Sequence, residues 1–302
     1  MLDYDRVRRT ASRRCTLVAA TALTVSLTAL GAATPALATI HHPTGEFAKF
    51  ADCPLSIEAV NGCVYAETNG GKFTVGKRTV PINKTIVLQG GFEVTETGLQ
   101  FEGAENGETL AKVPLAVPGG LLDILAPEWL NKKQKEEFEE AVNKGPTGVT
   151  ATTELAAPAS EIGLSTENLL EQTGTALSLP VKIKLGNAFL GNNCYVGSNA
   201  HPIVINFTTG KTEPPKPNEP IEGAPGELEF NSSFTIITLK GGKLVNNSFA
   251  APGATGCGAP FSWLIDEAVN SELGLPASAG HNTAILEGNL STGAAEAVKE
   301  SE

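Results

Sequence analysis

Apolar and polar residues alternate along much of the chain with a period of two, which is typical of strands that bury one face. Between residues 64 and 113 the alternating apolar positions are Val80, Ile82, Ile86, Leu88, Phe92 and Val94. The segments 69–71, 90–91 and 106–107 interrupt these strands with glycine and asparagine. Because both residue types tolerate positive φ, we expect hairpin turns at all three positions. Pro81 cannot donate to a sheet ladder, so its strand is predicted to lie at an edge.

The same alternation returns in the second half of the chain. Short strands are predicted over 181–185 and 203–207, and a hairpin over 228–245 is predicted to turn at Gly241-Gly242. A last strand is expected over 282–290. Together these segments predict a mainly β fold: an antiparallel β-sandwich or a partly closed barrel, with two packed or surface helices.

Two segments carry the end signals of helices. Residues 127–144 begin with Pro127 and are followed by Gly145, with acidic residues early and Lys144 late. In residues 262–273, Ser262 is the predicted N-cap and Gly274 the stop. The apolar residues of this second helix share one face, which we expect to pack onto a sheet: Leu264, Ile265, Ala268, Val269 and Leu273.

Three further segments are predicted to be irregular. Residues 146–180 are rich in Thr, Ala and Ser and predict a loose connection with one short helix over 166–172. Residues 212–225 contain five prolines and predict an exposed loop or linker. Residues 292–302 predict a frayed acidic tail. Residues 39–302 are expected to form a single domain, with 39–180 and 181–302 as its two halves.

The N-terminal residues predict a secretory signal peptide over 1–38. Five arginines precede an apolar run over 17–33, and Ala36-Leu37-Ala38 follows as a small-residue cleavage site. An uncleaved membrane anchor is the alternative, but this run is at the short end for spanning a bilayer. Arg13-Arg14 partly match a twin-arginine signal, and Sec export fits equally well. We expect a secreted, extracellular protein, with or without retention at the cell wall.

The charge balance narrows the choice of partners. The full chain has 22 basic and 33 acidic residues and a net charge of −11. Loss of residues 1–38 removes five arginines and two aspartates, which leaves a net charge of −14 and one arginine, Arg78. Because an acidic protein repels polyanions, the sequence argues against nucleic acids and anionic membrane surfaces as partners.

Four cysteines follow the predicted cleavage site: Cys53, Cys63, Cys194 and Cys257. An even number in an exported chain predicts two disulfides, and the spacing lacks the paired C-x-x-C of zinc sites. Our preferred pairing is Cys53–Cys63 and Cys194–Cys257. A regular hairpin turning at residues 61–62 would place Cys53 and Cys63 roughly 23 Å apart, whereas a disulfide needs Cα atoms within about 7 Å. Either residues 54–61 form a compact loop or the crossed pairing is correct.

Residues that could catalyse a reaction are few. The segment 163–167 departs from the G-x-S-x-G elbow at its last position. Ser198, Asp266 and His281 supply the residue types of a hydrolase triad, but they would have to converge in space. The sequence contains no Asp-rich calcium loop and no glycine-rich phosphate motif before a helix. No catalytic residue, cofactor or metal is therefore assigned.

The apolar run after residue 115 is the candidate for a ligand-binding surface. The residues assigned to it are Leu121, Leu122, Leu125 and Trp129, and Val117 precedes them in the same run. We expect a non-enzymatic structural or binding module that acts on a component of the cell envelope. A carrier of a small apolar molecule or lipid is the first alternative, and a hydrolase is the second.

Two stretches of the C-terminal half resemble a group of uncharacterised secreted proteins of actinobacteria. They are residues 190–203, which include Asn192-Asn193-Cys194-Tyr195, and residues 273–284, which include Gly280-His281-Asn282. The resemblance implies a secreted protein. It implies no activity, cofactor or site residue.

Overall fold

The computed structural model of the chain describes residues 42–96, 98–120, 132–133 and 148–302. The described residues all belong to one compact unit. The predicted signal peptide over 1–38 and nearly all of the predicted helix over 127–144 lie outside the described residues.

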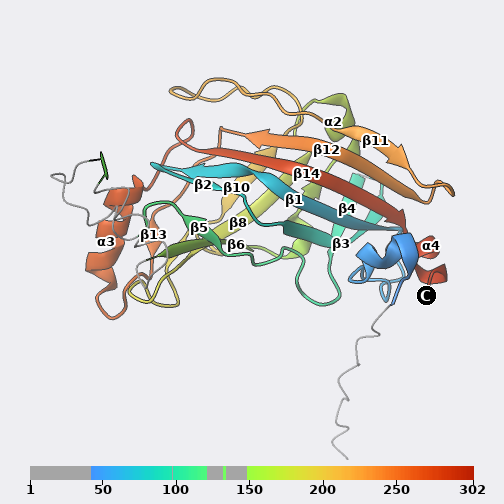
Figure 1. The fold of residues 1–302 in the computed structure, drawn as a ribbon, viewed down its shortest axis with the longest axis horizontal. Coiled ribbons are helices and arrows are strands. Elements are labelled where there is room, and N and C mark those ends of the chain that lie inside the picture. Colours follow the sequence, from blue (N-terminus) through green and yellow to red (C-terminus); the bar gives the residue numbers. More distant parts are fainter. Residues whose placement is uncertain (1–41, 97, 121–131, 134–147) are drawn as a thin grey trace, which may run out of the picture. The chain divides into compact units, whose positions relative to one another are not determined.

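The described residues form a mainly β fold built on one 14-stranded sheet, in which every named pair of strands is antiparallel (Figure 1). The main path through the sheet has the order β11-β12-β14-β1-β3-β4-β7-β8-β6-β5, and the sheet is not closed. In chain order the strands are β1 (Gly62–Val75), β2 (Arg78–Pro81), β3 (Ile86–Thr95), β4 (Gly98–Gly103), β5 (Leu115–Val117), β6 (Val149–Leu155), β7 (Gly163–Leu164), β8 (Leu177–Gly186), β9 (Tyr195–Val196), β10 (Ile203–Phe207), β11 (Glu227–Phe230), β12 (Ile236–Asn246), β13 (Ala254–Thr255) and β14 (Thr283–Ala294). The predicted fold class is confirmed.

The main core lies between two parts of this sheet that face each other. Val64 and Leu88 project from β1 and β3, and Leu179 and Ile205 project from β8 and β10 into the same buried cluster. The alternation is clearest in β10, whose five residues are buried and exposed in strict alternation. The apolar alternation seen in the sequence is therefore the inner face of the sheet.

Three of the four glycine-containing segments expected to be turns lie inside strands instead. The register shifts within β1 between Thr68 and Gly70, and within β12 between Leu239 and Gly242, while residues 90–91 continue the pairing of β3. Gly71 has φ +99°, and a Cβ there would lie 2.0 Å from the carbonyl oxygen of Ile285. Positive φ and close backbone approach serve a bulge in a bent strand as well as a turn, so the residue types alone mislead. Only the turn at 106–107 is confirmed.

Residues 146–180 are not a loose connection, because they contain the strands β6 and β7. β6 is rich in threonine, whose branched Cβ favours extended backbone, and it pairs with β8 from Thr150 to Leu155. The short helix predicted here is confirmed as α2 (Thr166–Glu171), which the hydroxyl of Ser165 caps. Leu169 of α2 packs on the inner face of β12 against Leu239.

The helix α3 (Ser262–Leu273) has the predicted bounds and ends at Gly274 in the left-handed conformation. Its inward face is narrower than predicted. Val269 is buried, and Ile265 and Leu273 pack against the core, whereas Leu264 and Ala268 are exposed. Phe261, rather than Ser262, occupies the N-cap position.

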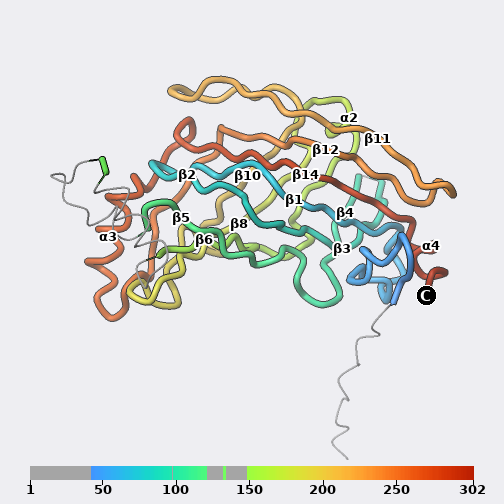
Figure 2. Tube along the Cα trace, viewed as in Figure 1, coloured from blue at the N-terminus to red at the C-terminus, as the bar shows by residue number. Residues whose placement is uncertain are grey.

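The C-terminal residues are ordered rather than frayed. β14 runs to Ala294, and α4 (Ala295–Glu300) follows it at the C-terminal end of the chain (Figure 2). Val298 of α4 is buried in a second core with Phe50 of the 3₁₀ helix η1 (Gly45–Phe50). Thr44 donates from its backbone N–H and its hydroxyl to the carbonyl of Ser301 at 3.2 and 2.6 Å. The prediction of a frayed tail over 292–302 is wrong, because polarity alone does not show which tail residues bury an apolar face.

Both predicted disulfides are present. Cys53 and Cys63 join across Cα atoms 5.4 Å apart, and Cys194 and Cys257 join across 4.1 Å. Residues 54–61 form the compact loop that the first pair requires, with the N–H of Ile57 bonded to Pro54 and that of Val60 bonded to Ile57. All four cysteines are buried. Two buried disulfides are typical of proteins that fold in an oxidising, extracytoplasmic compartment.

The proline-rich segment 212–225 is pinned by asparagine side chains. The amide of Asn218 donates to the carbonyls of Asn247 and Asn282 at 2.9 and 2.8 Å, and the amide of Asn247 donates to the carbonyl of Glu219 at 2.8 Å. Near its base, the N–H of Thr212 donates to the carbonyl of Ile221, and Ala224 and Lys243 exchange two backbone hydrogen bonds. The segment is therefore held on the body of the fold at both its base and its middle.

Candidate apolar binding site

An apolar cavity of about 70 Å³ lies in the main core, between the two parts of the sheet that face each other. Its wall includes Ala66 and Leu88 on one side and Leu179, Val181 and Ile205 on the other. These residues come from β1, β3, β8 and β10, so the cavity lies within the main core. We name it the central cavity.

Two further apolar cavities share walls with the central cavity. The first, of about 70 Å³, lies beneath α2 and shares Ala66, Leu177 and Leu286 with it. The second, of about 50 Å³, reaches Leu273 at the end of α3 and shares Phe73 and Thr153 with it. We name these the α2 cavity and the α3 cavity. The three cavities therefore follow one another through the core.

Small side chains on the inner face create this series. Ala66 and Thr68 of β1 line the α2 and central cavities, and Ala151 and Thr153 of β6 line the α3 cavity. In a core between facing sheets, large side chains normally interdigitate, so alanine and threonine opposite one another leave space. Small residues at inward positions of otherwise regular strands are therefore the sequence signal from which these cavities could have been predicted.

Charged and amide side chains line only the two outer cavities. Glu67, Lys243 and Asn289 are on the wall of the α2 cavity, and Arg78 is on the wall of the α3 cavity. The central cavity has only Thr68 and Thr153 among its polar lining residues. Such a site can hold an apolar chain in its middle and meet a polar group at either end.

The residues assigned to a ligand site from sequence, Leu121, Leu122, Leu125 and Trp129, lie outside the described residues. The start of the same apolar run is described. Leu115 and Val117 of β5 line the α3 cavity, so this part of the run does contribute to the interior site.

Ser198, Asp266 and His281 each have local surroundings of their own. The hydroxyl of Ser198 accepts the N–H of His201 at 3.1 Å, and the backbone N–H of His281 donates to Ser278 at 3.2 Å. Asp266 accepts two backbone N–H groups of the 256–257 segment. Within the described part of the chain, no hydrogen bond joins any two of these three residues, so the geometry needed for a triad is not seen.

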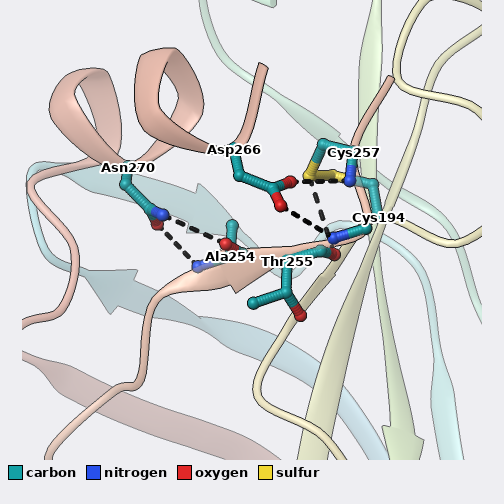
Figure 3. The surroundings of a disulfide bond; sticks show 7 residues. Cys194, Ala254, Thr255, Cys257, Asp266 and Asn270 are labelled. Carbon is teal, nitrogen blue, oxygen red and sulfur yellow. Dashed lines mark hydrogen bonds between the residues drawn. A yellow bond between two sulfur atoms is a disulfide. The ribbon is translucent and has the colours of Figure 1, made fainter. Parts of the chain in front are cut away.

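Asp266 and Asn270 instead hold the segment that carries Cys257. The carboxylate of Asp266 accepts the N–H of Cys257 at 2.7 Å and that of Gly256 at 3.2 Å (Figure 3). The side chain of Asn270 accepts the N–H of Ala254 at 2.6 Å and donates to its carbonyl at 3.0 Å. Both side chains come from α3, so the helix and the Cys194–Cys257 disulfide brace the same strand end.

Tyr195 and Tyr65 are expected to ionise above their ordinary range. Burial raises the pKa of each phenol, and the nearby carboxylates of Glu154 and Glu67, respectively, raise it further. Because the folded-state pKa is raised, the protonated phenols contribute stability that is complete below pH ~10 and lost as the pH rises through the folded-state pKa.

We expect tyrosinate absorbance at 295 nm to rise at higher pH in the folded than in the unfolded protein. Glu154→Gln should move one of these transitions down; an unchanged curve would contradict this assignment.

The described residues contain neither a candidate metal cluster nor a helix that could span a membrane. No group of three or more His, Cys, Asp and Glu side chains in these parts of the chain could share a metal ion. No helix among the same residues is both long and apolar enough to cross a bilayer.

The comparisons with known proteins give no relative. No known protein family matches the sequence, and no curated protein or solved structure is significantly similar to it.

Proposed function

We propose that this chain is a secreted binding protein of the cell envelope that carries a small, slender apolar molecule in its interior. The observation that carries the proposal is the series of three apolar cavities with shared walls. The N-terminal signal pattern and the two buried disulfides support an extracytoplasmic location.

The three adjoining cavities leave part of the core unfilled, and a bound ligand would fill it. Protein interiors are packed as densely as organic crystals, and voids larger than a water molecule are few. Each void also lowers stability, since its lining loses contacts. A filled series removes that loss, because an apolar chain would supply the missing contacts.

The dimensions and the chemistry of the wall select the ligand class. Each cavity is smaller than the roughly 150 Å³ engineered cavity that admits benzene. A bulky ring system would have to displace side chains, whereas an unbranched aliphatic chain could extend from one cavity to the next. Charged and amide side chains lie only on the walls of the two outer cavities, so we propose binding rather than turnover.

Ala66→Leu tests the site, because Ala66 lies on the wall shared by the α2 and central cavities. For the unsubstituted protein we expect linear alcohols or carboxylic acids of increasing chain length to raise the Tm, since a ligand that binds only the folded state stabilises it. The larger side chain should remove at least 90% of that shift while leaving the Tm without ligand unchanged or higher.

Ala116→Leu is the matched control. Ala116 is an exposed residue of β5 between two inward residues, so the same substitution adds the same apolar atoms outside the cavities. The control should keep the full ligand-induced shift. Equal shifts in both variants, or none in the unsubstituted protein with any chain length, would contradict the proposal.

A further inference from the structure

The turn between β11 and β12 presents an exposed group of large apolar side chains. These are Leu228, Phe230, Phe234 and Ile237, exposed by 49%, 49%, 75% and 40%. The rings of Phe230 and Phe234 contact each other with centroids 5.7 Å apart. We name this group the hairpin tip. Adjoining exposed apolar side chains mark interaction surfaces more often than isolated ones do.

The hairpin tip is held in a fixed conformation. Asn231 accepts the N–H groups of Thr235 and Ile236 at 2.9 Å each, and its amide donates to Ser233, Thr235 and Glu46. Phe234 has φ +59°, which is rare for a bulky residue. Backbone of this kind persists where the surrounding contacts impose it, and it is often found at functional sites. Here it holds an aromatic ring in solvent.

The strand register connects the hairpin tip to the cavities. Leu228 pairs with Leu239, and Phe230 pairs with Ile237, so these four residues project from the same face of the β11–β12 pair. Leu239 lines the α2 cavity. β11 is at the end of the main strand order, and all four of its residues are exposed, so its faces are open to solvent.

The size and charge of the hairpin tip favour a lipid surface over a protein partner. A stable protein interface uses about 20 to 30 residues on each side, whereas this group has four. No charged residue occurs from Phe230 to Leu239. The neighbouring charges include Glu46, which holds the turn, and Glu229, which is paired with Lys240. An uncharged apolar tip on an acidic protein matches a lipid surface with zwitterionic head groups and not an anionic one.

We propose that the β11–β12 hairpin tip inserts its apolar side chains into the surface of a zwitterionic lipid layer. Insertion places the edge of the sheet beside the α2 cavity against the lipid. The proposal goes beyond binding of an apolar molecule in the interior and does not depend on it, because the hairpin tip would bind lipid whether or not the cavities are filled.

Flotation with phosphatidylcholine vesicles tests this inference. The double variant Phe230→Ser/Phe234→Asn removes both rings, and asparagine tolerates the positive φ at residue 234. We expect the protein to float with the vesicles and the variant to partition at least about tenfold more weakly, since the transfer of each ring from water is favourable. Vesicles with added phosphatidylserine should bind the unsubstituted protein more weakly. The unfolding temperatures of the protein and the variant should agree closely, because Phe230 is half exposed and Phe234 is three-quarters exposed.

A second exposed group supplies the control. Phe261 and Trp263 lie at the start of α3, and Trp263 is 73% exposed. Phe261→Ser/Trp263→Ser should leave flotation unchanged. The inference is overturned if the protein does not float, if the hairpin variant floats equally well, or if only the α3 variant fails to float. It is also overturned if the hairpin rings prove to be needed for a dimer and not for vesicle binding.

Discussion

Replacement of Cys194 and Cys257 by alanine is expected to lower the free energy of unfolding by about 4 kcal/mol. The two residues are 63 positions apart, so their disulfide closes a long loop in the unfolded chain, and the loss of chain entropy grows with loop length. A domain of ordinary stability has about 5 to 15 kcal/mol in total. The double variant should therefore unfold at a much lower urea concentration than the unsubstituted protein.

The matched control is the Cys53→Ala/Cys63→Ala pair. These cysteines are 10 positions apart, and the shorter loop predicts a loss of about 3 kcal/mol. Equilibrium urea unfolding, followed by circular dichroism, gives both values. A loss below 1 kcal/mol for the Cys194–Cys257 pair would show that the contacts of Asp266 and Asn270 hold the 254–257 segment without the disulfide.

Asn282→Ala is expected to be the most destabilising of the single substitutions considered, with a loss of about 3 kcal/mol. Asn282 is fully buried, and its side chain joins three parts of the chain. It accepts the N–H of Gly76 at 2.9 Å and donates to the carbonyls of Phe249, Ser278 and Ala277 at 2.9, 3.2 and 3.3 Å. Truncation removes the hydrogen bonds to the N–H of Gly76 and the carbonyl of Phe249 in a place that water reaches poorly, whereas the carbonyls of Ala277 and Ser278 keep the N–H groups of Ala251 and His281.

Asn206→Ala is the control for that result. Asn206 is exposed on β10, and its side chain accepts only the hydroxyl of Ser178. We expect this substitution to change the free energy of unfolding by about 0.5 kcal/mol or less. Thermal and urea unfolding should rank the two variants in this order. Equal losses would mean that the buried bonds of Asn282 are replaced after truncation.

The sequence predicted the features that depend on local pattern. The alternation of apolar residues gave the mainly β class, the end signals of α3 gave its bounds, and the cysteine count with preferred pairing gave both disulfides. The turns predicted at the glycine pairs 90–91 and 241–242 were wrong, because a bulge or a close strand contact uses the same conformational freedom of glycine. Only the strand pairing distinguishes the two.

The candidate site could not be predicted because it depends on which strands face each other. Ala66 and Thr153 are 87 positions apart, and nothing local shows that both leave space in one core. The direction in which two polar side chains of α3 point could not be predicted from the helix pattern either. Asp266 and Asn270 face the 254–257 segment and bond to it, although charged and amide residues on a helix usually face solvent.

The central claim is that the interior of the protein carries an apolar molecule. The most direct test is native mass spectrometry of the protein purified from its producing cells. The account predicts a noncovalent mass that remains bound under gentle ionisation and is lost when the protein unfolds. The mass should be that of a slender aliphatic compound, and Ala66→Leu should lack it. A bare polypeptide that also takes up no linear alcohol or carboxylic acid added in excess would contradict the account.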